Sequence, residues 1–442
     1  MTISRRWFLA GLALTGAAVP AAYYGHRELT RVDEPITPGE ATVDLATLAG
    51  QQLANNLRGV WDVRFEGRDA GLAGLPLDGL QLFLDVAHRG RGLRGFLDTA
   101  QGLRADAQPR YRVVGDLVPA NPAQVRWRLV NRDSAGGAPD YEFIVTLDEV
   151  WADFGNAGSG TLSGVIMDLH RPLMLAESEN RFIAIKRTFP EARERIGLNP
   201  TLLAWLIAPE HRLFHQLWHA SRDKWHTLSE EKRGALRGIG WQPGPRDQER
   251  DARGPRKDRN GSGVDFFFMH RHMLTTARSM QDLPSWPSFP MPQPELERDR
   301  QGFARYFDNH DGFALPPTWM AEGDDEYTQW VSDIKAAETY HSNFQVWESQ
   351  YRDPRYLSTL SLGQFGSEIE LGLHDWLHMR WASVPRDPSN GAPVPMARDP
   401  ADFSARWFRP ENDFLGDPFS SHVSPVFWHF HGWIDDRVED WF

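Results

Sequence analysis

From about residue 55 to residue 188, apolar and polar positions alternate with a period of two and are interrupted by frequent turns. This alternation, together with many β-branched and aromatic residues, predicts strands. The predicted strands are Trp61–Phe65, Leu80–Leu84, Tyr111–Val114, Gln124–Val130, Tyr141–Leu147, Thr161–Met167 and Arg181–Lys186. Seven or eight such strands predict an antiparallel barrel or sandwich. We favour the barrel because a closed sheet leaves no open edges.

The pattern changes after Pro190, where the segments become helical. Thirteen of the 16 histidines lie beyond residue 210. Two stretches interrupt the helical pattern and are predicted to be surface loops, namely the charged Gly244–Gly261 and the proline-rich Pro284–Pro294. We therefore predict an α+β multidomain protein, with a β-barrel domain over 43–190 and a mainly α-helical domain over 200–442. The barrel is interpreted as structural or substrate-positioning, in preference to an independent ligand-binding barrel.

The N-terminus carries an Arg5-Arg6 pair followed by a weakly apolar run of small residues from Leu9 to Ala22. This pattern predicts a Tat export signal over residues 1–30 and a periplasmic protein. The alternatives are an ordinary Sec signal and a membrane anchor. The run is shorter than the ~20 residues of a comfortable membrane span, so we expect no stable span in the mature form. Whether the signal is cleaved is open.

The net charge and the cysteine content limit the partners and the kinds of site that the chain can have. The formal net charge of -12 disfavours phosphate backbones, so we expect no nucleic-acid partner. The chain has no cysteine, which excludes disulfides, thiolate metal sites and thiol nucleophiles. Any metal must therefore be held by His, Asp or Glu.

His374 and His378 are four residues apart, so on a helix they lie on one face and can reach one metal ion. His431 is a natural third ligand. Three imidazoles without a thiolate suit copper, zinc, iron or nickel. A zinc protease would have Glu directly after the first histidine, where this chain has Asp375.

A second set of histidines lies earlier in the chain. His211, His215 and His219 follow one another at i, i+4 spacing, and His270 stands inside an aromatic run. Two sets of three histidines, each with a pair from one helix and a single residue from another, can form a dinuclear site in a helical bundle.

Two motifs around His374, His378 and His431 carry a resemblance to a known family. They are His374-Asp375-x-x-His378 and Ser424-Pro425-x-Phe427-x-x-x-His431-x-x-x-Asp435-x-Arg437. The chain resembles the type-3 copper proteins, which comprise tyrosinases, catechol oxidases and hemocyanins. The resemblance implies two copper ions as cofactors. It also implies that His431, four residues before Asp435, is a ligand, and that His429 serves in packing or beside a ligand. Ser424 departs from the family's Asp, which affects the cap of the last helix.

At the first copper, Phe268-Met-His270-Arg271 resembles the family's Trp-His-Arg. A tyrosinase would supply another histidine where this chain has Gly261. Arthropod hemocyanins instead take two ligands from one helix, and the row of His211, His215 and His219 could supply two ligands in the same way. We favour His215 and His219 over His211 and His215. His226 is a further candidate ligand. The histidines that we interpret as polar-site or surface residues are His272, His310, His341 and His422.

The resemblance implies a copper-dependent oxidoreductase that uses dioxygen to hydroxylate phenols at the ortho position, to oxidise them to quinones, or both. Two carboxylates match the family's water-holding groups: Glu370, four residues before His374, and Asp375, in place of the family's Asn. Both are predicted to be catalytic because a phenol, with a pKa near ~10, must lose its proton. The alternatives are a glutamate on the helix surface and an aspartate that orients an imidazole.

Within the family, the export signal, the barrel and the helical domain resemble the periplasmic tyrosinases of pyoverdine maturation in pseudomonads. Those enzymes act on a tyrosine-derived group of a peptide siderophore precursor. We therefore expect a phenolic small molecule or a peptide-borne phenol, together with dioxygen, as partners. The alternatives are a hemocyanin-like dioxygen-binding protein and a degenerate copper fold without turnover. The substrate, the balance of monophenol and diphenol activity, and the oligomeric state, a homodimer included, are left open.

Overall fold

The computed structural model describes residues 56–66, 76, 78–86, 92–104, 107–118, 124–131, 140–146, 160–169, 181–187, 190–238, 262–321, 323–394 and 404–442. The predicted export signal over 1–30 and the predicted loop Gly244–Gly261 lie outside these residues. The chain divides into two compact units. One takes its described residues from Thr37–Arg195 and Met291–Ser332, and the other from Ile196–Pro290 and Asp333–Phe442.

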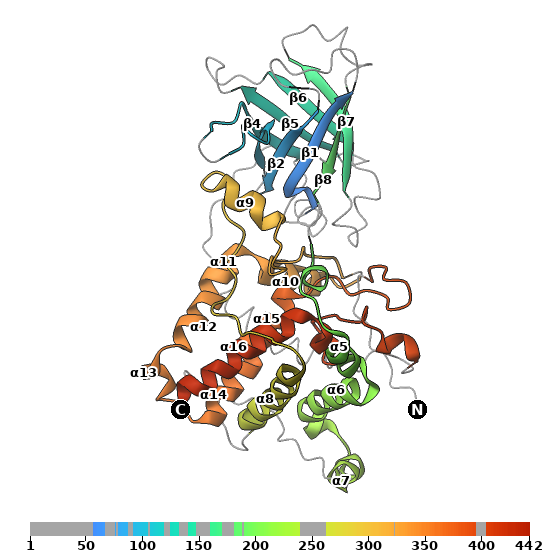
Figure 1. Cartoon of the computed structure of the whole chain (residues 1–442), viewed down its shortest axis with the longest axis vertical. Coiled ribbons are helices and arrows are strands. Elements are labelled where there is room, and N and C mark those ends of the chain that lie inside the picture. Colours follow the sequence, from blue (N-terminus) through green and yellow to red (C-terminus); the bar gives the residue numbers. More distant parts are fainter. Residues whose placement is uncertain are drawn as a thin grey trace. The chain divides into compact units, whose positions relative to one another are not determined.

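Eight antiparallel strands close into a barrel in the first unit (Figure 1). They are β1 (Gly59–Glu66), β2 (Leu80–Val86), β3 (Leu93–Thr99), β4 (Tyr111–Val118), β5 (Gln124–Asn131), β6 (Tyr141–Thr146), β7 (Thr161–Asp168) and β8 (Arg181–Lys186). Each strand pairs with its neighbours in the chain, and β1 pairs with β8. The predicted barrel is confirmed over the sandwich, and the helices that follow it confirm the α+β class.

The sequence pattern misses one strand, β3, because Gly95 interrupts its apolar residues. The structure requires a glycine here. A Cβ atom at residue 95 would lie 1.8 Å from the carbonyl oxygen of Phe83 on the neighbouring β2. The residue that weakens the strand signal is therefore the one that lets the two strands approach.

Inward-pointing aromatic side chains fill the barrel interior. Trp127 stacks on Phe143 with ring centroids 5.6 Å apart, and Phe143 meets Phe182 edge-on at 4.7 Å. All three are buried, as is Trp61. Burial of one large apolar side chain stabilises a fold by ~1.5–3 kcal/mol, so this cluster is the main source of stability in the barrel.

The outside of the barrel is partly covered by α9 (Arg300–Phe307), from the returning segment Met291–Ser332. Phe303 and Phe307 of α9 pack with Val60 and Phe83, whose strand neighbours point into the barrel. The helix begins at Asp299, whose side chain accepts a hydrogen bond from the backbone N–H of Gly302 at 2.7 Å. This packing explains why both faces of β2 are buried.

Helices dominate the rest of the chain (Figure 1). The α-helices are α4 (Ala192–Arg195), α5 (Pro200–Ile207), α6 (Pro209–Lys224), α7 (Glu230–Gly238), α8 (Ser262–Met280), α10 (Asp325–Lys335), α11 (Ala337–Thr339), α12 (Gln345–Gln350), α13 (Pro354–Leu357), α14 (Leu362–Ile369), α15 (Asp375–Trp381) and α16 (Pro425–Trp441). Two π-helical turns, η3 (Tyr340–Phe344) and η4 (Glu370–His374), and three 3₁₀ turns, η2 (Trp225–Thr227), η5 (Ala405–Phe408) and η6 (Ser421–Val423), complete the list.

Helices α8 and α14 touch through their backbones. A Cβ atom on Gly366 would lie 2.1 Å from the carbonyl oxygen of Gly263, and one on Gly263 would lie 2.0 Å from that of Gly363. Only glycine permits so close a crossing. The contact brings α8, which carries His270, next to the helix that continues into η4 and α15.

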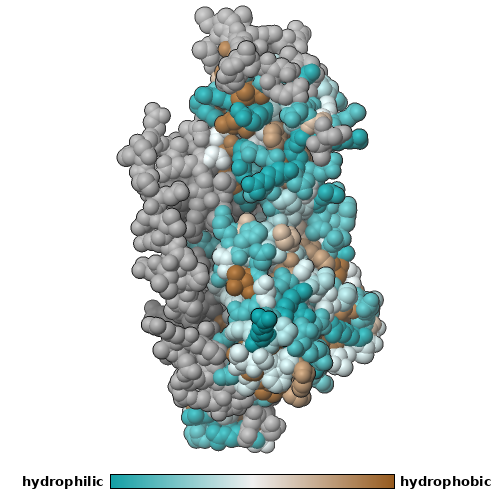
Figure 2. Space-filling view, turned by 90° about the vertical axis from the view of Figure 1, so that its left-hand side faces the viewer, coloured by the Kyte–Doolittle hydropathy of each residue, from teal (hydrophilic) through white to brown (hydrophobic). Residues whose placement is uncertain are grey.

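The proline-rich stretch Pro284–Pro294 has no regular secondary structure, as predicted, but it is not wholly at the surface. Trp286 and Phe289 are 3% and 1% exposed. On the face shown in Figure 2, apolar residues of the described part form small separate patches among polar ones. Among the described helices, none combines the length and the apolar character needed to cross a membrane.

Candidate metal centre

The six predicted ligands lie together in the interior of the helical unit. Helix α6 supplies His215 and His219, α8 supplies His270, the η4–α15 segment supplies His374 and His378, and α16 supplies His431. Five of them are buried and His378 is half-buried.

The first group consists of His215, His219 and His270. One ring nitrogen of each lies within 4.8 Å of those of the other two, a spacing that could hold one metal ion. The i, i+4 spacing on α6 places the rings of His215 and His219 with centroids 4.9 Å apart.

The second group surrounds His374. Its Nε2 lies 2.9 Å from Nε2 of His378 and 3.2 Å from Nε2 of His431. His270 also has a ring nitrogen within 4.8 Å of those of His374 and His431. The two groups therefore adjoin at His270, as they would in a dinuclear site.

The hydrogen bonds at Nδ1 decide which nitrogen of each ring is free. Nδ1 of His270 donates to the carbonyl oxygen of Phe266 at 3.0 Å, and Nδ1 of His431 to that of Phe427 at 2.8 Å. A carbonyl oxygen can only accept, so Nδ1 carries the proton. In a neutral ring, Nε2 then holds the lone pair.

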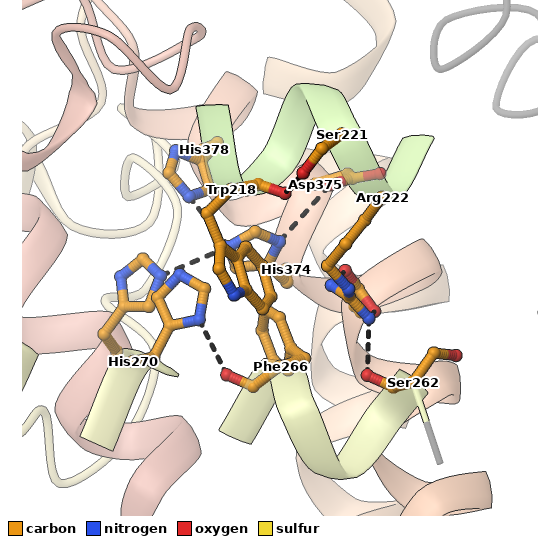
Figure 3. A network of polar contacts seen from close by, with 11 residues as sticks. Trp218, Ser221, Arg222, Ser262, Phe266, His270, His374, Asp375 and His378 are labelled. Carbon is orange, nitrogen blue, oxygen red and sulfur yellow. Dashed lines mark hydrogen bonds and ion pairs between the residues drawn. The ribbon is translucent and has the colours of Figure 1, made fainter. Parts of the chain in front are cut away.

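The two residues of the η4–α15 segment follow the same rule. Nδ1 of His378 donates to the carbonyl oxygen of Leu415 at 2.6 Å, and Nδ1 of His374 faces Oδ1 of Asp375 at 3.3 Å (Figure 3). Asp375 thus takes the position of a carboxylate that orients a ligand imidazole.

Three lone pairs consequently face one another around Nε2 of His374. Lone pairs at these distances repel unless a cation lies between them. Nε2 of His215 and of His270 are buried and have no hydrogen-bond partner among the described residues. Buried polar atoms are nearly always paired, so these unpaired nitrogens are compatible with a bound metal ion.

Burial also favours the neutral rings that a metal needs. It is the largest cause that lowers the pKa of His378 to about 3 and the pKa of His215, His270 and His431 well below the usual range. Neighbouring histidines lower these pKa values further, since one positive ring disfavours the next. The rings therefore stay neutral, which is the form that ligates metal.

Aromatic rings enclose the imidazoles. The ring of Phe427 stacks on His431 with centroids 3.7 Å apart, and Phe430 lies 4.4 Å from the same ring. Phe266 contacts both His270 and His374, at 4.5 and 4.8 Å. Such a wall limits the approach of water to the nitrogens.

Glu370 forms a buried ion pair with Arg222 of α6. Nη2 of Arg222 lies 3.0 Å from Oε2 of Glu370, and Nη1 contacts Oε1. The two side chains are 0% and 1% exposed. The guanidinium also donates to the carbonyl oxygen of Ser262 and lies 4.2 Å from the ring centroid of Trp218. The pair joins the helices that carry the two groups of histidines.

A second ion pair joins α8 and α16. Arg271, next to His270, pairs with Asp435, one turn after His431, at 2.6 Å, and its other arm reaches Glu439. Ser424 is the N-cap residue of α16 and makes no side-chain capping bond there.

None of the other described histidines belongs to either group. His211 is buried against Trp205, with ring centroids 3.9 Å apart, and burial lowers its pKa to about 4. Nδ1 of His429 donates to the carbonyl oxygen of Pro284. His272, His310 and His341 are exposed. The side chain of His226 lies outside the part that the structure describes.

Sequence reasoning missed the partners that hold the ligands. His422, interpreted as a polar-site or surface histidine, is fully buried and lies against His215. The two residues are 207 positions apart, so no local spacing links them. Arg222 and the carbonyl of Leu415 likewise carry no signal in the sequence.

The donor set consists of imidazoles alone, which suits copper, zinc, iron or nickel. Comparisons of the chain with models of protein families and with curated proteins return no match. The choice among these metals therefore depends on the sequence motifs around the ligands.

Proposed function

We propose that the six clustered histidines bind two copper ions and that the protein oxidises phenols with dioxygen. The observation that carries the proposal is the set of buried Nε2 lone pairs around His374, at 2.9 and 3.2 Å, beside a second group of three histidines. Copper is preferred to zinc because of the resemblance of the motifs at His374-Asp375-x-x-His378 and at Ser424–Arg437 to those of type-3 copper proteins.

In this proposal, His215, His219 and His270 hold one ion, and His374, His378 and His431 hold the other. When bound, a copper pair supplies the electron transfer by which dioxygen oxidises a phenol ring. The chain holds six imidazoles, and the rings of Phe266, Phe427 and Phe430 pack against several of them. Preorganised ligands of this kind lower the cost of binding the metal.

The two predicted catalytic carboxylates differ in their surroundings. The side chain of Asp375 is 22% exposed, whereas that of Glu370 is 1% exposed and paired with Arg222. We therefore assign Asp375 to the transfer of the phenol proton. Glu370 acts as a positioning residue that joins η4 to α6. Its water-holding role stays a prediction.

The substrate class and the location follow from the resemblance alone. A phenolic small molecule and a phenol carried by a peptide siderophore precursor are the two substrates to test. Export by the Tat route and a periplasmic location stay predictions, because residues 1–30 lie outside the described part of the chain.

The test is oxygen consumption by the copper-loaded protein with a monophenol, a catechol and a tyrosine-containing peptide. The variant His378→Ala removes one ligand next to His374. We expect it to lose phenol oxidation by at least about 10³-fold and to bind about half of the copper. His272→Ala, on the exposed side of α8, is the matched control and should keep both.

Each outcome separates the alternatives. Full activity in His378→Ala would show that the second group does not hold the reactive metal. Two bound copper ions with reversible oxygen uptake and no quinone would indicate a dioxygen carrier instead. Fewer than two copper ions in the wild-type protein would indicate a copper-fold binding module.

A further inference from the structure

The ligand His215 has an unusual partner at its Nδ1. Three other proposed ligands, His270, His378 and His431, donate from Nδ1 to backbone carbonyls. Nδ1 of His215 instead lies 3.0 Å from Nδ1 of His422, with both side chains buried. Because the two atoms are of the same kind, one must donate and the other must accept.

The hydrogen bond at the other nitrogen of His422 decides which of the two Nδ1 atoms donates. Its Nε2 lies 3.0 Å from the carbonyl oxygen of Leu206, at the end of α5, and a carbonyl can only accept. Nε2 of His422 therefore carries the proton. A neutral imidazole has one such proton, so Nδ1 of His422 holds a lone pair and Nδ1 of His215 donates to it.

The neutral form of His422 fits its surroundings. The residue is 0% exposed, and burial is the largest cause that lowers its pKa well below the usual value. The indole N–H of Trp428 donates to the carbonyl oxygen of His422 at 3.0 Å, which fixes its backbone at the start of α16. Its ring lies 5.0 Å from that of His215 and nearly at right angles to it.

Because Nδ1 of His215 carries the proton, Nε2 of His215 holds the lone pair. That atom is buried, has no hydrogen-bond partner in the described part of the chain, and belongs to the group with His219 and His270. We propose that His422 is a positioning residue for the first metal: it accepts the Nδ1 proton of His215 and so makes Nε2 the ligand atom. The inference rests on the proposed two-metal site.

The segment that carries His422 also serves the second group. Residues 404–424 contain Leu415, whose carbonyl accepts from His378, and His422, which accepts from His215. The buried Arg212 of α6 holds this segment by donating to the carbonyl oxygens of Phe419 at 3.1 Å and Arg409 at 2.8 Å. One segment thus sets the orientation of one ligand in each group.

The test compares three substitutions of His422 that place different atoms at its two nitrogens. In His422→Asn, the amide oxygen falls near the position of Nδ1 and can still accept from His215. In His422→Gln, the amide falls near Nε2, which keeps a donor for Leu206 but leaves Nδ1 of His215 without an acceptor. His422→Leu removes both hydrogen bonds.

Copper ions are titrated into each metal-free protein against a competing chelator. We expect the wild type and His422→Asn to bind two ions with similar affinities. His422→Gln and His422→Leu should bind one ion normally and the other about 10- to 100-fold more weakly, as for other residues that orient a metal ligand. Circular dichroism checks that each variant is folded.

A second readout needs no metal. In ¹⁵N-histidine spectra of the metal-free protein, His215 should be protonated at Nδ1 in the wild type and in His422→Asn, and should be a mixture of tautomers in His422→Gln. If His422→Leu fails to fold, the comparison of His422→Asn with His422→Gln still tests the role of His422.

The outcomes also separate this inference from the proposed function. A wild-type protein that binds two copper ions, with unchanged affinities in His422→Gln and His422→Leu, would overturn the role of His422 and leave the two-metal site intact. A wild-type protein that binds no copper would overturn the proposed function. In that case, Nδ1 protonation of His215 that is lost in His422→Gln would still support the hydrogen-bond chain.

Discussion

The interior of the barrel is filled by apolar and aromatic side chains, whereas the interior of the helical unit also holds histidines, arginines and two glutamates. An apolar interior is stable because it leaves water, and its packing needs no particular partner. A polar interior is stable only when each group is paired. In the helical unit, Arg222 pairs with Glu370 and Arg212 with backbone carbonyls, while Nε2 of His215 and of His270 have no partner among the described residues.

The two interiors therefore differ in what they could offer a ligand. The barrel interior offers stacked rings such as Trp127 and Phe143, with few groups that could bind or react. In the helical unit, the buried rings of His215 and His270 are hydrogen-bonded at Nδ1 and have no hydrogen-bond partner at Nε2 among the described residues. Substitutions in both units test how far each interior depends on the pairing of its polar groups and on its packing.

The largest effect is expected at the buried ion pair. Arg222→Met leaves Glu370 charged and without its partner in the interior. Removal of one partner of a buried pair costs about 3–5 kcal/mol, so the helical unit should unfold at much lower denaturant concentration. The double variant Arg222→Met, Glu370→Leu removes both charges and should be less destabilised than Arg222→Met. A loss below about 1 kcal/mol in Arg222→Met would contradict the view that this interior depends on pairing.

A smaller effect is expected at the crossing of α8 and α14. Gly366→Ala places a Cβ atom against the backbone of Gly263, so the helices must move apart. Overpacking of this kind costs about 1–3 kcal/mol, and it should also weaken metal binding because α8 carries His270. Gly234→Ala on α7 is the matched control. No atom of the described residues lies within 4 Å of its added Cβ, and the change should stabilise the helix by up to about 1 kcal/mol. Equal effects of the two variants would show that the close crossing is unimportant.

The barrel unit also contains a buried cationic residue, Lys186, and its effect on stability can be measured. Burial of Lys186, the largest cause, lowers its pKa from 10.5 to about 7, and its Nζ donates to the carbonyl oxygen of Asn56. The unfolded chain binds one more proton than the folded chain between these pKa values, so stability rises with pH across that range.

The rise should have a slope of up to about 1.4 kcal/mol per pH unit. Lys186→Met should flatten it and should be most stabilising relative to the wild type near the lower end of the range. Urea unfolding of the barrel, followed by its tryptophan fluorescence between pH 7 and 9, measures the slope in both proteins. An unchanged slope in Lys186→Met would show that this lysine is not the titrating group.

Much of this architecture could be predicted from local patterns. Alternation predicted seven of the eight strands, because inward and outward side chains of a barrel differ in polarity. The strand that was missed contains Gly95, where a close backbone approach outweighs strand preference. The return of Met291–Ser332 to the barrel unit has no local signature, since it depends on contacts between distant segments.

The proposed ligands could be predicted because spacing on a helix sets which side chains meet a common ion. His215 and His219 on α6, and His374 and His378 around η4, show this directly. The groups that orient them could not be predicted. His422, Arg222 and the carbonyl of Leu415 reach the site through the tertiary fold, and a carbonyl carries no information in the residue type.

The most direct test of the account is the metal content of the wild-type protein, measured by elemental analysis after the metal-free chain has been loaded with copper and freed of excess. Six imidazoles in two adjoining groups predict two copper ions per chain, with both lost on acidification as the rings become protonated. A protein that retains no copper, or a single ion that persists when His378 and His215 are both replaced by alanine, would contradict it.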